Sequence, residues 1–123
     1  MARIRITAAN VSLEAELNDS ATAKSLLKAL PITGRASRWG DEIYFSIPVD
    51  ADEGPEARAD VKVGEIAFWP PGSAFCIFWG PTPASTGPEP RAASPVNPLG
   101  QIDGDATQFA AVSNGAKVTI EAL

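Results

Sequence analysis

Two neighbouring stretches of the chain, residues 64–69 and 74–79, are apolar at almost every position. Successive side chains of a strand point to opposite faces, so large apolar residues at consecutive positions leave neither face polar. Strands of this kind lie in the middle of a fold and are covered on both sides. Pro70-Pro71-Gly72 joins the two stretches, and this composition is typical of a tight connection. The two stretches therefore predict a central pair of strands that needs covering layers on both faces.

The segments around this pair alternate polar and apolar residues, which is typical of strands with one exposed face. The N-terminal segment predicts a hairpin that turns at Asn10, and Gly40-Asp41 predicts the turn of a second pair. In the C-terminal segment, Val118, Ile120 and Ala122 are expected to face inward. The predicted strands lie at residues 2–17, 32–39, 42–47 and 117–123.

Two short helices are predicted between these strands. Asp19 or Ser20 is suited to cap a helix that runs to Leu30 and ends at Pro31. Asp105 is suited to cap a second one that ends at Val112. Central apolar strands that need cover on both faces favour a closed sheet. We therefore expect a mainly β protein, a closed β-barrel with two short capping α-helices, formed by one domain over residues 1–123.

Two segments have the composition of loops. Residues 49–60 hold five carboxylates together with Gly54 and Pro55, and residues 80–98 hold six of the eleven prolines. The acidic segment lacks the glycine and the final glutamate of a calcium-binding loop, so we expect no metal there. A long loop in a compact domain is often functional, and we predict one over residues 80–98.

The charge and the reactive residues exclude several functions. Ten basic and fifteen acidic residues give a net charge of −5, which disfavours nucleic acid as a partner. The chain has no histidine and one cysteine, so imidazole catalysis, an internal disulfide and a multi-thiolate metal site within one chain are excluded. No window is apolar enough to span a membrane, and residues 1–7 do not form a leader core. We expect a cytoplasmic protein with no cofactor, no metal and no membrane partner.

Residues 64–83, which read GEIAFWPPGSAFCIFWGPTP, resemble the signature of a small prokaryotic cyclophilin-like family, and we expect a bacterial protein. Residues 99–104, LGQIDG, are similar to the segment that leads into the second helix of true cyclophilins. The resemblance implies the barrel of cyclophilins, and the family has no agreed activity. Peptidyl-prolyl cis/trans isomerisation is the activity of the true cyclophilins.

This chain departs from the isomerase pattern at the positions that match its pocket. The strand at residues 43–47 has no arginine, Cys76 stands in place of the pocket phenylalanine, and Val96 lies near the histidine position. The resemblance therefore implies the fold more strongly than the enzyme. Isomerisation itself needs only an apolar pocket and a donor that weakens amide resonance.

The candidate site residues follow from that requirement. Arg35 and Arg38 are the candidate catalytic donors, with an exposed strand face as the alternative interpretation. Cys76 lies in an apolar strand with no histidine to activate it, so we expect an inert thiol. Glu65 begins a central strand and must line a ligand site or find an ionic partner. The candidate ligand-binding residues are Trp39, Tyr44, Glu65, Trp69, Phe75 and Phe78, with core packing as the alternative for the aromatic ones.

Three functions remain open at this point. The first is a barrel that binds a peptide or a small molecule, with residues 80–98 as a lid. The second is an atypical peptidyl-prolyl cis/trans isomerase. The third, from analogy of fold, is a detached subunit of a larger amide-metabolising enzyme. We expect a monomer or a homodimer, the latter if Trp79 is exposed beside the proline-rich loop.

Overall fold

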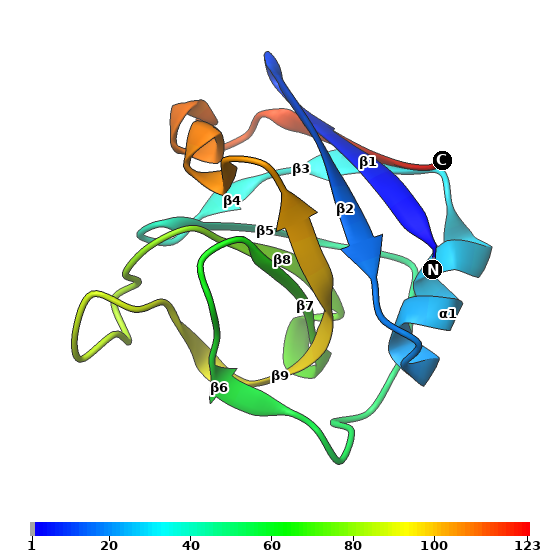
Figure 1. Cartoon of the computed structure of the whole chain (residues 1–123), viewed down its shortest axis with the longest axis horizontal. Coiled ribbons are helices and arrows are strands. Elements are labelled where there is room, and N and C mark those ends of the chain that lie inside the picture. Colours follow the sequence, from blue (N-terminus) through cyan, green and yellow to red (C-terminus); the bar gives the residue numbers. More distant parts are fainter. Residues whose placement is uncertain (1) are drawn as a thin grey trace.

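The computed structural model describes residues 2–123 and shows a mainly β protein whose strand pairs are all antiparallel (Figure 1). Strand order in the sheet is β3-β10-β1-β2-β9-β7-β8-β5-β4, and β6 pairs with β9 beside this path. The elements are β1 (Arg3–Ala8), β2 (Val11–Leu17), α1 (Ala21–Ala29), β3 (Ile32–Arg35), β4 (Ser37–Arg38), β5 (Glu42–Ser46), β6 (Arg58–Asp60), β7 (Glu65–Trp69), η1 (Pro70–Gly72), β8 (Ala74–Phe78), β9 (Arg91–Asp103), η2 (Ala106–Ala111) and β10 (Lys117–Ala122).

The two ends of the sheet are consecutive in the chain. Only Ala36 separates β3 from β4, and its backbone donates to Ala116 and accepts from Gly115. Over residues 2–123 no ladder joins β3 to β4, so the hydrogen bonding leaves the sheet open at this point. The antiparallel sheet is confirmed, and its closure into a barrel stays a prediction.

The central pair of strands is β7 and β8, and it is covered on both faces as predicted. Every residue of β8 is buried, as is every residue of β7 before Trp69. The face with Phe68 and Phe75 belongs to the main core, together with β1, β2 and β10. The opposite face belongs to a smaller group, which we call the second cluster. It consists of Val61, Ala67, Ala74, Cys76, Phe78, Ala92 and Val96, with Tyr44 and Trp69 packed against it.

The second cluster is covered by a strand that the sequence analysis assigned to a loop. Residues 91–103 form β9, so the expected loop over 80–98 is wrong from residue 91 onward. In Figure 1, β9 runs from its start beside β6 to its end beside β2. Its register with β7 shifts between Pro98 and Gly100, and proline, which has no N–H to pair, is tolerated in strands beside such irregularities.

Asn97 fixes β9 at this irregularity. Its amide donates to the Asp52 carbonyl at 2.9 Å and to the Thr22 hydroxyl at 3.2 Å, and its oxygen accepts from the Gly54 N–H at 2.8 Å. The side chain is buried, and a buried amide is stabilising only when its polar atoms find partners. Asn97 therefore joins β9 to the acidic loop and to the start of α1.

Other predictions hold in part. Ser20 caps α1 through the Ala23 N–H, and the helix ends before Pro31. The second helix is the 3₁₀-helix η2 and not an α-helix, since its six residues are too few to reward α-helical pairing. No helix of residues 2–123 has the length and apolarity that crossing a membrane requires.

Three predicted details are wrong. Residues 32–39 do not pair as a unit with 42–47, because β3 pairs with β10 and only β4 pairs with β5. Ala122 is exposed at the end of β10. Trp79 is buried at 5% exposure against Phe109, so it offers no exposed surface for a dimer.

Gly100 provides a test of how closely β9 approaches β2. A methyl group there would clash with the backbone carbonyl oxygen of Glu16 in β2 and would lie 3.0 Å from the Leu17 Cα, and these backbone atoms cannot move without shifting the strand. We expect Gly100→Ala to lower the free energy of unfolding by about 1–3 kcal/mol in urea denaturation. In Gly87→Ala the new methyl group meets only the Glu89 side chain at 3.7 Å, so stability should stay within about 0.5 kcal/mol. Equal stabilities for the two variants would contradict the close approach.

Candidate functional site

A cavity of about 220 Å³ opens on the face of β5, β7 and β8 that carries the second cluster. Its lining combines residues of β5, β7, β8 and the first half of β9 with one residue of the turn before β5. These are Trp39, Glu42, Tyr44, Trp69, Cys76, Ala92, Ala93 and Val96. The cavity is predominantly apolar, as ligand sites in proteins are.

Strand register explains why these side chains meet. Tyr44 pairs with Cys76 across β5 and β8, and Cys76 pairs with Ala67 across β8 and β7. Directly paired residues share one face of a sheet, and so do residues two positions apart on one strand. Glu42 therefore lies on the same face as Tyr44, and Trp69 lies on the same face as Ala67.

Three aromatic side chains form the walls, and all three are half-buried. The Trp69 indole N–H donates to the Ser94 hydroxyl at 2.7 Å, which orients the ring against β9. The Trp39 backbone N–H donates to the Glu42 carbonyl at 3.0 Å and closes the turn between β4 and β5. The structure thus brings together Trp39, Tyr44 and Trp69, the three candidates from strand ends and the wetter faces.

Glu42 is the polar residue that the sequence analysis missed. It is 4% exposed, and no arginine or lysine within residues 2–123 forms an ion pair with it. Burial disfavours the charged form and raises the pKa of Glu42 to about 7, although a hydrogen bond from the Cys76 side chain lowers it in part. A signal was available, because Glu42 alternates with Tyr44 on a strand whose other face is apolar.

Cys76 lies beside this carboxyl group and is buried. Burial raises the pKa of the Cys76 thiol well above its usual value, and the Glu42 charge raises it further. The thiol is therefore protonated at neutral pH, which agrees with the expectation that it is inert. It contributes a small, soft part of the cavity wall.

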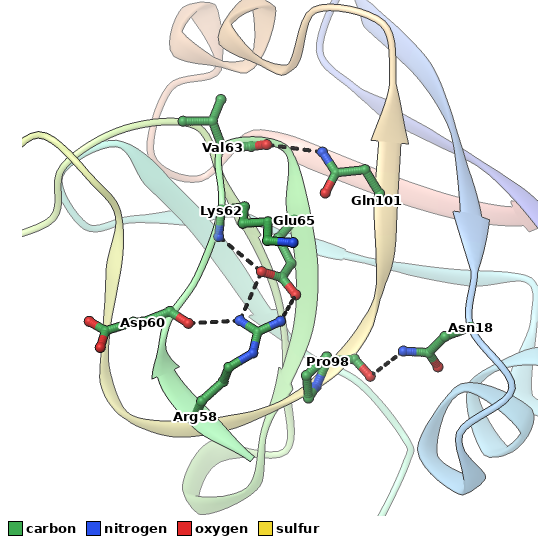
Figure 2. A network of polar contacts seen from close by, with 8 residues as sticks. All are labelled: Asn18, Arg58, Asp60, Lys62, Val63, Glu65, Pro98 and Gln101. Atoms are coloured by element: carbon green, nitrogen blue, oxygen red, sulfur yellow. Dashed lines mark hydrogen bonds and ion pairs between the residues drawn. The ribbon is translucent and has the colours of Figure 1, made fainter. Parts of the chain in front are cut away.

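The structure places Glu65 away from the cavity lining and gives it an ionic partner (Figure 2). Arg58 forms a two-pronged ion pair with the carboxylate, with nitrogen–oxygen distances of 3.0 and 2.5 Å. The Lys62 backbone N–H donates to the same carboxylate at 2.9 Å. Glu65 is buried at 5% exposure, and the pair raises the pKa of the Arg58 guanidinium. The ion pair between Arg58 and Glu65 therefore joins β6 to the start of β7.

The two candidate arginines are also outside the cavity lining. Arg38 pairs with Ile43, a main-core residue, so it lies on the opposite face from Glu42 and Tyr44. Its guanidinium donates to the backbone carbonyls of Gly40, Ala110 and Val112 and lies 5.0 Å above the Trp79 ring. Arg35 is exposed and donates to the Gly115 carbonyl at 3.3 Å.

The remaining two aromatic candidates are fully buried. Phe75 belongs to the main core, with its ring centroid 5.8 Å from that of Phe45. Phe78 belongs to the second cluster and pairs with Glu42, yet it is not among the residues that line the cavity. The structure therefore places Phe75 on the opposite face from the cavity, and it places Phe78 on the cavity's face of the sheet but outside the lining.

The raised pKa of Glu42 predicts how stability depends on pH. The group titrates near 4.5 when unfolded and near 7 when folded, so between these values the folded state holds a proton that the unfolded state has released. The stabilisation from this proton is complete below the unfolded pKa and is lost as pH rises through the folded pKa. The free energy of unfolding should change by about 3 kcal/mol over this range.

Urea denaturation at about pH 5 and about pH 8 tests this prediction, which rests on the linkage of protonation to folding. We expect the difference between the two stabilities to shrink in Glu42→Gln, because glutamine keeps the shape of the neutral acid and does not titrate. The exposed carboxylate variant Glu121→Gln is the control and should retain the wild-type difference. An unchanged pH dependence in Glu42→Gln would show that folding does not raise the pKa of Glu42.

Comparison with known proteins agrees with the fold. A family model described as cyclophilin-like matches residues 2–121. No curated protein matches the chain. The solution structure of the hypothetical protein AF2241 from Archaeoglobus fulgidus is 35% identical, has a TM-score of 0.84, and the match covers 99% of this chain and 95% of that one.

A more distant similarity is to the structure of McbB in complex with tryptophan, with 14% identity and a TM-score of 0.65. That match covers 96% of this chain and 44% of McbB, and at this identity it shows the fold alone. The family model, in contrast, spans nearly the whole chain, and the archaeal structure matches it over almost its full length. On these grounds the chain belongs to the cyclophilin-like family.

Proposed function

We propose that this protein binds a small molecule, or one apolar side chain of a peptide, in the cavity walled by Trp39, Tyr44 and Trp69. The observation that carries the proposal is that three half-buried aromatic rings surround an apolar cavity with one buried carboxyl group in its lining. Ligand sites typically combine an apolar wall with a few polar groups that fix orientation.

The size of the cavity limits the ligand. An engineered apolar cavity of about 150 Å³ is sufficient for benzene. The cavity here measures about 220 Å³, so it suits one ring with a short substituent. It is too small for an extended peptide, of which only a single side chain would enter.

The cyclophilin-like fold is compatible with such a ligand. McbB, which shares the fold at low identity, has been solved in complex with tryptophan, a molecule with one aromatic ring system and a short polar substituent. This similarity supports a ligand of that size class and says nothing of the residues that would bind it here.

Prolyl isomerisation is the alternative, and the positions of the arginines do not favour it. Isomerisation needs a donor directed at the amide of a bound proline. The Arg38 donors are engaged with three backbone carbonyls, and the guanidinium lies on the face opposite the cavity. A detached subunit of a larger amide-metabolising enzyme is favoured by no particular contact.

The proposal includes a closed frame around the site. Gly34 of β3 lies so close to Phe45 of β5 that a methyl group would come within 2.6 Å of its ring. The chain turns from β3 into β4 at Ala36, whose backbone groups are both paired. We therefore propose that the two ends of the sheet pack against each other and close the barrel through side chains.

A variant that fills the cavity tests the proposal. Ala92 lines the cavity on the same face of β9 as Ser94, so Ala92→Phe directs a ring into the site, and circular dichroism checks that the variant is folded. In an NMR titration with benzyl alcohol, we expect wild-type shifts at the Trp39 and Trp69 indole N–H groups, with affinity reduced about tenfold or more in Ala92→Phe. Ala122→Phe, at an exposed alanine of β10, is the matched control and should bind as the wild type does. No binding by the wild type, or equal binding by all three proteins, would refute the proposal.

The same sample distinguishes the isomerase alternative. Uncatalysed cis/trans exchange of Xaa-Pro peptides takes tens of seconds or longer, so exchange cross-peaks that need the protein report catalysis. We expect no such cross-peaks. Their appearance, and their loss in Arg38→Ala with the fold retained, would replace binding by isomerisation as the function.

A further inference from the structure

We propose that the ligand of this cavity carries an organic ammonium group, which sits against the faces of Trp39, Tyr44 and Trp69 with the Glu42 carboxylate as its counter-ion. The inference rests on the proposed function and names the chemical class of its ligand. It concerns one group of one ligand, whether that group belongs to a free amine or to a lysine side chain.

The walls of the cavity attract cations. The face of an aromatic ring carries negative potential, and a cation over tryptophan or tyrosine is stabilised most where water is excluded. The lining holds three such rings and one carboxyl group, and it holds no lysine or arginine. The three aromatic rings and the carboxyl group of the lining therefore all favour a positively charged ligand.

No other aromatic ring and no cation of the described residues is placed against these three rings. In the described part of the chain, the paired aromatic rings are Phe45 with Phe75 and Trp79 with Phe109, and none of these lines the cavity. The one cation placed over a ring within residues 2–123 is Arg38 above Trp79, on the other face of the sheet. The cavity rings thus lack a cation such as the Arg38 guanidinium that lies over Trp79.

Glu42 distinguishes a cationic ligand from an anionic or a neutral one. A buried carboxylate without a positive partner is costly, and the group avoids this cost by holding its proton. An ammonium ion in the cavity would supply the missing charge, so Glu42 would release its proton as the ligand binds. The other titratable groups that line the cavity, Cys76 and Tyr44, cannot supply positive charge. An anion would meet both the rings and the carboxyl group unfavourably.

Matched probes test this inference by calorimetry at about pH 8. Benzylamine is a cation at this pH because alkyl ammonium groups have a pKa well above 8. Benzylamine and benzyl alcohol are of similar size and differ in charge. We expect the wild type to bind benzylamine about tenfold or more tightly than benzyl alcohol. Glu42→Gln should abolish this preference, so that it binds the two probes with similar affinity, whereas the exposed-carboxylate control Glu121→Gln should keep the preference. A lysine whose amino and carboxyl termini are both blocked tests whether the ammonium group belongs to a lysine side chain. Binding of this compound in place of benzylamine would identify the ligand as a peptide.

Proton release gives a second readout that needs no variant. Repeating the benzylamine titration at about pH 6 in buffers of different ionisation enthalpy should show up to about one proton released per ligand, since Glu42 is protonated there without ligand. Benzyl alcohol should release none. Binding of benzyl alcohol as tight as that of benzylamine, or benzylamine binding without proton release, would overturn the inference and leave the proposed function intact. Binding of neither probe would overturn the proposed function as well.

Discussion

The bend of β9 at Asn97 and Pro98 is the constraint on which the rest of the structure depends. Before the bend, β9 pairs with β6 and covers the outer face of the central strands; after it, β9 pairs with β7 and β2 inside the sheet. The register shift and the missing N–H of Pro98 interrupt the ladder, and the three hydrogen bonds of Asn97 hold the strand at that point. One strand thereby builds both the sheet and the cover over its second face.

The cavity is a consequence of this cover. Ala92, Ala93 and Val96 on the first half of β9 supply one wall, and Ser94 fixes the indole of Trp69. Small side chains at positions 92 and 93 leave space where larger ones would complete a second core. The cavity therefore lies where the second cluster is incompletely filled, between half-buried aromatic rings and a strand of short residues.

Many of the strands could be predicted from the sequence, because alternation of polar and apolar residues and runs of apolar residues are both visible in a short stretch of chain. They located β7 and β8, and they placed Tyr44 on the face away from Phe45. They failed at β9, because prolines at positions 95 and 98 are typical of a loop and the bend that accommodates them depends on distant partners. They also missed Glu42, since a glutamate after Gly40-Asp41 resembles an exposed turn residue until β9, from far along the chain, covers it.

Glu42 and Glu65 are both buried, but only Glu65 has a positively charged partner, so the two glutamates have different roles in this chain. Both are about 95% buried, and each is the first residue of its strand. Glu65 has the Arg58 guanidinium and a backbone N–H, so its charge is satisfied within the protein and fastens β6 to β7. Glu42 has no cationic partner among the described residues, and its pKa is raised to about 7. This buried acid beside three aromatic rings forms no ion pair within the described residues, and we propose it as the counter-ion of a cationic ligand.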